Sequence, residues 1–218
     1  INITGQILPI KKICAMAHAK GVQVLVDGAH AFAHFQYSID DLGCDYYAAS
    51  LHKWLSSPLG AGILYINKNR IKNLWPLLAD GEKQLDKIKR LNHIGTHPVA
   101  TDLAINDSID YYEMIGAEKK EARLRYLQNY WTSKVRNNPK IIINTPVDQT
   151  KCCGIANVGI VGIKPSVVAS RLMNEFKIFT VAIDYINVIG CRICPNVYTT
   201  TDELDQFVNA LNTLAKNV

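Results

Sequence analysis

Three residues of the chain could do chemistry together: Asp27, Lys53 and Arg192. Lys53 stands in SLHKW, directly after CDYYAA, which is poor in charge and typical of a buried strand in an α/β protein. Asp27 ends the apolar run VQVLV, and a carboxylate there would face the crevice where such folds bind ligands. The Lys53 amine could serve as a nucleophile, the Asp27 carboxylate as the partner of a protonated group, and the Arg192 guanidinium as an anion-binding group.

Together the three residues match the needs of a pyridoxal phosphate site. The Lys53 amine could hold the cofactor's aldehyde as a Schiff base and later act as a base. Asp27 could keep the pyridine nitrogen protonated, and Arg192 could bind the carboxylate of an amino-acid substrate in a bidentate manner. Each residue also has an ordinary explanation: Asp27 as a turn cap, Lys53 on the surface, Arg192 in an ion pair. The combination favours catalytic roles for Lys53 and Asp27 and a substrate-binding role for Arg192.

The first third of the chain alternates between helix and strand signals. A helix is expected from Pro9 to Lys20, with Gly21 as its stop, and strands are expected at VQVLVD, CDYYAAS and AGILYI. Alternation of this kind predicts an α/β fold with a mainly parallel sheet and flanking helices, its strands covered on both faces.

The rest of the chain predicts connecting helices and then a small α+β domain. In AEKKEARLRYLQNYWTSKVRN apolar residues recur at helical spacing, which indicates one long helix. After Pro139 short strands alternate with helices, one opened by Pro165 and the last by a capping box of Thr200 with Glu203. The expected domains are 1–98, an α/β domain with the candidate cofactor site; 99–138, connecting helices; and 139–218, a small C-terminal α+β domain.

Composition excludes several classes of protein. The 218 residues are 48% hydrophobic with a net charge of +5, which is compatible with a phosphorylated cofactor. Membrane spans and nucleic-acid binding are not expected, because apolar runs are short and basic residues form no stripe with aromatic ones; a cytoplasmic protein is expected. Cys191 and Cys194 have the C-x-x-C spacing of some metal sites. Side chains alternate between the two faces of a strand, so two residues three positions apart would point to opposite faces, and no metal site is expected.

Four stretches resemble the class V aminotransferase family of fold-type I pyridoxal phosphate enzymes, in the family's order and over nearly the whole chain. TGQILPIKKICAMAHAKGVQVLVDGAHA is similar to the stretch that leads to the pyridinium aspartate, and SLHK to the Schiff-base motif. HIGTHPVATDLAI is similar to the Gly-Thr segment that reaches the cofactor phosphate of a neighbouring subunit, and CRICPNVYTTTDELDQFVNAL to the carboxylate-arginine strand and its helix.

The resemblance implies a role for each matching residue. Ala29 would pack its methyl group against the cofactor ring, and His30 would hydrogen-bond the ring's phenolic oxygen. Ser50 and His52 would contact the phosphate, and Thr96 would do so across a homodimer interface. His34 and His97 are expected to be packed or solvated histidines. The implied cofactor-binding residues are Asp27, Ala29, His30, Ser50, His52, Lys53 and Thr96.

Within the family, the DGAHA form is most similar to isopenicillin N epimerase-like proteins, which implies a reaction at Cα of an amino acid, epimerisation or transamination. Cysteine desulfurases carry a nucleophilic cysteine on a loop before the arginine strand, and here only DYINVIG separates FTVAI from Cys191; a desulfurase or other lyase remains the alternative. Only 26 residues precede Asp27, fewer than the family's phosphate loop and ring-stacking residue need. A missing N-terminal segment is therefore expected, and a non-catalytic truncated fragment is a further alternative.

Overall fold

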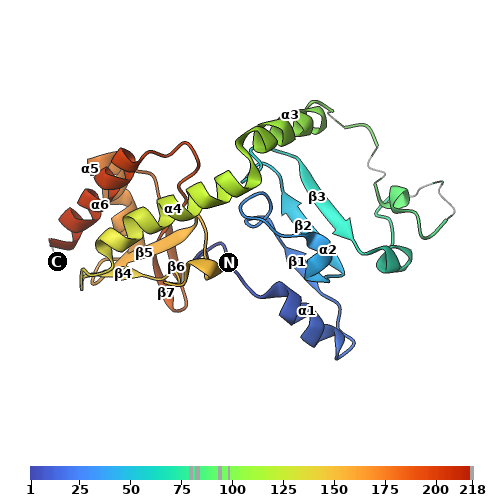
Figure 1. Ribbon diagram of the computed structural model, residues 1–218, viewed down its shortest axis with the longest axis horizontal. Helices are drawn as coiled ribbons and strands as arrows, with labels where there is room; N and C mark the ends of the chain where they lie inside the picture. The colour runs from blue at the N-terminus through green and yellow to red at the C-terminus, as the bar shows by residue number, and fades with distance from the viewer. Residues whose placement is uncertain (79–80, 82–83, 93–94, 98, 217–218) are drawn as a thin grey trace. The chain divides into compact units, whose positions relative to one another are not determined.

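The computed structural model describes residues 1–78, 81, 84–92, 95–97 and 99–216 (Figure 1). Its chain forms two compact units: residues Pro9–Gly116 make one, and Ile1–Leu8 with Ala117–Val218 make the other. Both contain helices and a sheet, which confirms the mixed α/β class. The expected domain boundaries after residues 98 and 138 stay a prediction.

The unit Pro9–Gly116 begins with the expected helix. Pro9 precedes the helix, and its ring fixes φ at a value that suits a helix start. Ser38 caps the next helix by accepting a hydrogen bond from the Asp41 amide, and Gly43, with φ of 69°, ends it. The elements are α1 (Ile10–His18), β1 (Leu25–Asp27), α2 (Ile39–Leu42), β2 (Tyr46–Ser50), β3 (Gly62–Ile66), η1 (Lys68–Asn73), η2 (Ile88–Leu91) and α3 (Ala100–Ile115).

The three strands of this unit lie in the order β1-β2-β3. β1 pairs with β2 in parallel, with Asp27 opposite Ala48. β3 departs from the parallel pattern that the alternation predicts, because it runs antiparallel to β2 with Ser50 opposite Gly62. The chain between these two residues is too short for a parallel crossover, which takes about a dozen residues or more.

Only one face of this sheet is well covered in the described part of the chain. Val26, Tyr47 and Ala49 lie on that face and are buried. On the opposite face Leu25 is 64% exposed and Leu64 is 57% exposed. The expectation that both faces of the VQVLVD strand are covered is therefore wrong for the described residues, because apolar composition does not reveal what packs on a strand.

A buried carboxylate holds several parts of this unit together. Asp45 is 3% exposed. It accepts hydrogen bonds from His18 Nε2 at 2.8 Å, the Val24 amide at 2.7 Å and Arg70 Nε at 2.7 Å. Burial alone would raise the pKa of Asp45, but the bonds from His18, Val24 and Arg70 outweigh it and lower the pKa to about 2. Asp45 thus ties α1, the start of β1 and η1 together as an anion.

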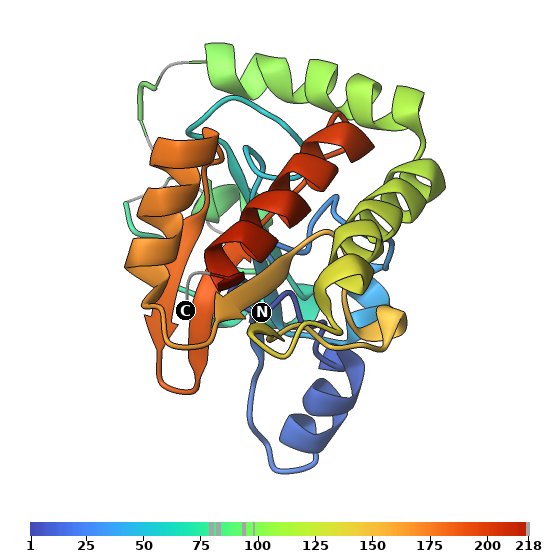
Figure 2. The ribbon, with the colours of Figure 1, turned by 90° about the vertical axis from the view of Figure 1, so that its left-hand side faces the viewer.

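The other unit is built on a four-stranded antiparallel sheet in the order β4-β5-β7-β6. Figure 2 shows α5 and α6 in front of this sheet. The core between helices and sheet includes Trp131, Val158, Leu172 and Leu211, each no more than 1% exposed. The elements are α4 (Ala117–Val135), β4 (Ile141–Ile143), η3 (Gln149–Lys151), β5 (Ala156–Ile160), α5 (Pro165–Phe176), β6 (Val181–Tyr185), β7 (Val188–Ile193) and α6 (Thr201–Lys216).

The helical signals of this unit are confirmed. Pro165 opens α5. At α6 the Glu203 amide donates to Thr200 Oγ1 at 3.2 Å, and the Thr200 amide donates to Glu203 Oε2 at 2.7 Å, which completes the capping box. The apolar residues that recur at helical spacing along α4 and α6 are buried: Leu124, Leu127, Trp131, Val135, Leu204, Phe207, Val208, Leu211 and Leu214.

The first residues of the chain pack on this second unit. The Ile7 amide donates to Lys151 O at 2.8 Å. Gly5 has φ of 76° and lies so close to the backbone that a Cβ atom there would be 2.0 Å from Ile155 O. Glycine is therefore required at this contact, and it fixes Ile1–Leu8 against the strand region around Ile155.

Candidate functional site

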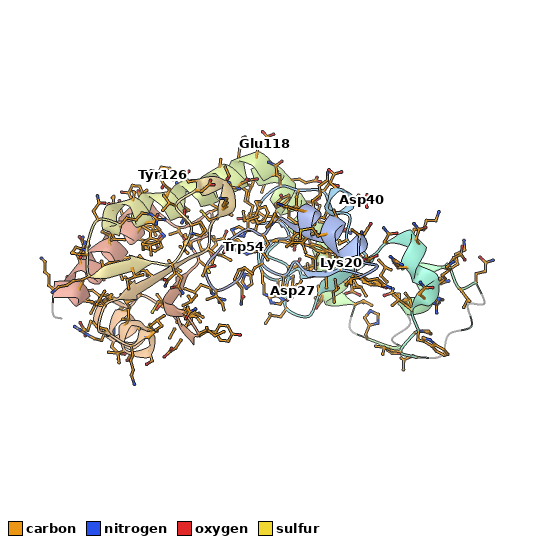
Figure 3. All side chains as sticks on the ribbon, turned by 90° about the horizontal axis from the view of Figure 1, so that it is seen from below. Lys20, Asp27, Asp40, Trp54, Glu118 and Tyr126 are labelled. Atoms are coloured by element: carbon orange, nitrogen blue, oxygen red, sulfur yellow. The ribbon has the colours of Figure 1, made fainter. Side chains whose placement is uncertain are left out.

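Four of the predicted site residues gather where β1 and β2 end. Asp27 is the last residue of β1, Ser50 is the last residue of β2, and His52 and Lys53 lie in the turn that follows β2. Because β1 and β2 are parallel, their carboxyl ends meet at the same edge of the sheet, which is where open α/β sheets bind ligands. Asp27 and Trp54, the neighbour of Lys53, are labelled in Figure 3.

A tight corner holds the carboxylate of Asp27 in place. Asp27 is exposed, and its Oδ1 accepts a hydrogen bond from the Ala29 amide at 3.0 Å. The Gly28 amide donates to Ala48 O at 2.7 Å, which extends the β1 and β2 pairing past the strand end. The turn-capping role that the sequence allowed for Asp27 is thus real, and it leaves the carboxylate at the ligand edge of the sheet.

Sequence reasoning missed the tyrosine beneath this corner. A Cβ atom on Gly28 would lie 1.9 Å from the Tyr47 hydroxyl oxygen, so only glycine fits there. The Tyr47 hydroxyl donates to Gly28 O at 3.3 Å and is also hydrogen-bonded to the Tyr37 hydroxyl. The glycine of DGAHA was the available signal, but the residue that approaches it depends on strand register.

A stacked pair of rings supports the segment that carries Ala29 and His30, both of them half-buried. His34 Nδ1 is hydrogen-bonded to His30 O at 2.9 Å. The His34 ring stacks on Trp54, with ring centroids 3.8 Å apart and planes inclined by 2°. His34 is therefore packed, as expected, and Trp54, which the sequence analysis did not single out, links the DGAHA segment to the residue after Lys53.

The turn that carries Lys53 is anchored on both sides. The Leu51 amide donates to Ala61 O at 3.1 Å, and the Ser57 amide donates to Leu51 O at 3.2 Å. Leu51, Trp54 and Leu55 are buried, whereas His52 and Lys53 are half-buried. Within the described residues His52 Nδ1 is buried without a hydrogen-bond partner, a condition that costs free energy unless a ligand or water satisfies it.

The segment around Thr96 is described only in part. His93, Ile94 and Pro98 of the Gly-Thr stretch lie outside the described residues. Thr96 is exposed, and beside it His97 Nε2 is hydrogen-bonded to an Asp102 carboxylate oxygen at 3.0 Å. That bond raises the pKa of His97. Contact of Thr96 with a neighbouring subunit stays a prediction.

Arg192 belongs to the other unit, in β7. It is half-buried, pairs with Asn157 on β5 and Val181 on β6, and donates from Nη1 to Asn2 O at 3.4 Å. Cys191 is buried and Cys194 is exposed, and burial raises the pKa of the Cys191 thiol. Among the described residues no group of three or more metal-ligating side chains could hold an ion.

The donor set at the end of β1 and β2 fits pyridoxal phosphate. A carboxylate and an amine stand at one sheet edge, as a protonated pyridine nitrogen and an aldehyde require. Next to them are the Ser50 hydroxyl and the buried, unsatisfied nitrogen of His52, which suit an anionic group. This fit concerns the unit Pro9–Gly116; Arg192 stands in the other unit and is described separately.

The fold and this site define a class of protein. The chain belongs to the aminotransferase class V family, whose sequence profile matches residues 1–207. Isopenicillin N epimerase of Streptomyces clavuligerus is 29% identical over 98% of this chain and 58% of its own length. A probable cysteine desulfurase of Halalkalibacterium halodurans is 29% identical over 78% of this chain and 43% of its own length.

Solved structures show the same fold. A cysteine desulfurase from Thermococcus onnurineus superimposes with a TM-score of 0.85 at 22% identity, over 98% of this chain and 57% of that one. An alanine–glyoxylate aminotransferase from Nostoc gives a TM-score of 0.77 at 17% identity, over 98% and 59%. The chain thus spans somewhat more than half the length of these proteins. None of the described helices is long and apolar enough to cross a membrane.

Proposed function

We propose that this chain is part of a pyridoxal phosphate enzyme that acts at Cα of an amino acid. Membership of the class V family supports a cofactor-dependent role. The observation that carries the proposal is the placement of Asp27 and Lys53 at the adjoining carboxyl ends of two parallel strands. When bound, the cofactor supplies an electron sink for negative charge at Cα.

The residues at the sheet edge divide the work. Lys53 Nζ would hold the cofactor covalently, and the Lys53 amine would serve as the base that takes the proton from Cα of the substrate. The Asp27 carboxylate would keep the ring nitrogen protonated. The Ala29 methyl group and His30 would contact the ring. The remaining residues, Ser50, His52 and, across a homodimer interface, Thr96, would hold the phosphate.

Arg192 completes the proposal by binding the substrate carboxylate, which orients the bond to be broken. We propose an epimerase or aminotransferase reaction, in line with the similarity to isopenicillin N epimerase, in a cytoplasmic enzyme. The tight connection between β6 and β7 supports this choice over a desulfurase, because Tyr185 pairs directly with Val188 and leaves no long loop there. Cys191 is fully buried with a raised pKa, so it is a poor nucleophile.

A desulfurase or other lyase remains the second candidate, on the strength of the desulfurase relatives. Conversion of L-cysteine to alanine, with sulfide released by an added thiol reductant and both products lost in a Cys194→Ala variant, would favour a desulfurase. Cys194 is the exposed cysteine beside Arg192.

Covalent labelling tests the proposal. The protein is mixed with pyridoxal phosphate and reduced with borohydride, and the modified lysine is identified by mass spectrometry. We expect the label on Lys53 and its loss in Lys53→Ala, while Lys68→Ala, a change at an exposed lysine of η1, keeps it. Equal labelling of Lys53→Ala and the unchanged protein would refute the assignment.

The same labelling, applied to this chain and to a longer protein containing it, separates the catalytic proposal from the truncated-fragment alternative. Label on Lys53 in both means that the 218 residues of this chain suffice for binding. Label in the longer protein alone means that residues beyond this chain complete the cofactor site.

A further inference from the structure

Asn157 is a fully buried polar residue in the middle of the second sheet. It is 0% exposed and lies on β5, directly opposite Arg192 on β7. The Asn144 amide donates to Asn157 O at 3.0 Å, so Asn144 lies beside it on the other side. Residues directly opposite each other in paired strands share a face of the sheet. Asn144, Asn157 and Arg192 therefore form a polar row across one face.

Hydrogen bonds fix the direction of both amides in this row. Asn144 Nδ2 is 3.2 Å from Ile189 O, a backbone carbonyl that can only accept, so the Asn144 nitrogen must point there. The same nitrogen is 2.7 Å from Asn157 Oδ1. A flipped Asn157 would place two donors against each other, so its oxygen faces Asn144 and its Nδ2 faces away.

Two donors of the row lack an acceptor. In the part of the chain that the structure describes, Asn157 Nδ2 and Arg192 Nε are both buried without a hydrogen-bond partner. An unmade hydrogen bond at a buried donor is costly, and two of them on directly opposed residues indicate a place for an external acceptor.

Two glycines lie beside the row, at positions where a side chain would collide with its neighbours. A Cβ atom on Gly190 would lie 2.3 Å from Asn157 Oδ1, and one on Gly159 would lie 2.5 Å from Ile189 O. Gly159 and Gly190 occupy the positions next to Asn157 and Arg192 on the same face, because side chains alternate along a strand. A side chain at Gly190 would displace the asparagine that presents the donor.

We propose that Asn157 Nδ2 and Arg192 Nε bind the same carboxylate of an amino-acid substrate, and that Asn144 positions Asn157 for this contact. The inference rests on the proposed function for the identity of the anion. A carboxylate offers two oxygens with several lone pairs, which suits two neighbouring donors, one of them charged. Asn157 is then a second substrate-binding residue, and Asn144 is a positioning residue.

Side-chain NMR of the isotope-labelled chain, without added cofactor, tests the contact. L-alanine and ethylamine are the probes, since they differ by the carboxylate. We expect L-alanine to shift the Asn157 amide and Arg192 Nε–H signals saturably, and ethylamine to leave them unchanged. The amide pair in which Asn138 Nδ2 donates to Asn212 Oδ1 at 3.0 Å is the internal control. Equal responses to the two probes, or none at Asn157, would overturn the proposal, and an ordered water would then be the acceptor.

An isosteric variant provides the second measurement. Asn157→Asp keeps an acceptor for Asn144 but offers Arg192 an internal carboxylate, so L-alanine should bind at least about tenfold more weakly, equal to roughly 1.4 kcal/mol. Asn212→Asp, which adds the same charge in the same unit, should leave L-alanine binding unchanged. Backbone amide signals show whether each variant folds. A folded Asn157→Asp variant with unaltered binding would exclude the shared contact.

The two proposals fail separately. Labelling of Lys53 tests the function and does not depend on Asn157. A carboxylate-specific response at Asn157 and Arg192 with no cofactor label would leave an anion site without the proposed reaction. A label on Lys53 with no such response would leave the enzyme and remove Asn157 from its site.

Discussion

The two units of this chain use different means to hold their residues in place. The unit with Arg192 encloses a continuous apolar core in which Trp131 and Leu211 are 0% exposed. The unit with Asp27 and Lys53 has smaller apolar clusters and a buried anion, Asp45, while Trp75 is 92% exposed. Apolar packing therefore dominates the unit with Arg192, whereas hydrogen bonds and ion pairs matter more in the unit with Asp27 and Lys53. The candidate cofactor site lies at the sheet edge of this second-named unit.

The largest contrast should come from two tryptophans. Trp131→Ala removes a fully buried ring that packs edge-on against Phe207 with centroids 5.2 Å apart, and should reduce the free energy of unfolding by about 3–5 kcal/mol. Trp75→Ala removes an exposed ring and should change it by less than about 0.5 kcal/mol. Urea unfolding, combined with hydrogen exchange to separate the two units, measures both. Similar losses would contradict the contrast.

The second largest loss of stability should come from replacing the buried carboxylate Asp45. Asp45→Asn removes the buried carboxylate that Arg70 and His18 share and so weakens its charge-assisted hydrogen bonds, which should destabilise this unit by about 2 kcal/mol. Asp205→Asn disrupts the ion pair between Asp205 and Lys134, in which both side chains are more than one third exposed, and should cost much less. The same unfolding measurement compares the two variants. A small loss of unfolding free energy in Asp45→Asn would show that Asp45 does not hold α1, β1 and η1 together.

Acid should affect the first unit through the same residue. The folded-state pKa of Asp45, about 2, lies below the ordinary value of 3.8, so its contribution is fully present above pH 3.8. The contribution is lost as pH falls from 3.8 toward 2, and amounts to about 2 kcal/mol. Unfolding of Asp45→Asn followed over this range should lack that part of the pH dependence. An unchanged acid profile in the variant would assign the loss to other groups.

The smallest effect concerns the start of α6. Thr200→Ala removes the capping side chain that accepts from the Glu203 amide, and should lower the stability of the second unit by about 1 kcal/mol. Thr213→Ala, inside the same helix, removes a hydroxyl that donates to Asn209 O and should be nearly neutral. Thermal unfolding of the pair tests it, and equal shifts would argue against a role for the cap.

Features that depend on near neighbours in sequence could be predicted. Two helix starts are defined by residues only a few positions apart: Pro165 at α5, and the capping box of Thr200 and Glu203 at α6. The sequence pattern was therefore sufficient to predict both. The positions of Asp27 and Lys53 at strand ends followed from apolar runs that stop abruptly. These signals located the edge of the sheet where the candidate cofactor site stands.

Features that depend on strand register could not be predicted. The antiparallel direction of β3, the approach of Tyr47 to Gly28 and the row formed by Asn157 and Arg192 all join residues that are distant in sequence. The hub at Asp45 likewise joins α1 to η1, and CDYYAAS alone gave no sign of its partners. A single sequence carries no record of which strands become neighbours.

The hydroxyl pair beneath the Asp27 corner provides an optical reporter of that corner. Burial raises the pKa of both Tyr37 and Tyr47, and in Tyr37 the bond to Tyr47 raises it further. During an alkaline titration these two tyrosines should therefore stay neutral until the fold opens. The late part of the tyrosinate absorbance therefore records whether the turn around Gly28 is intact.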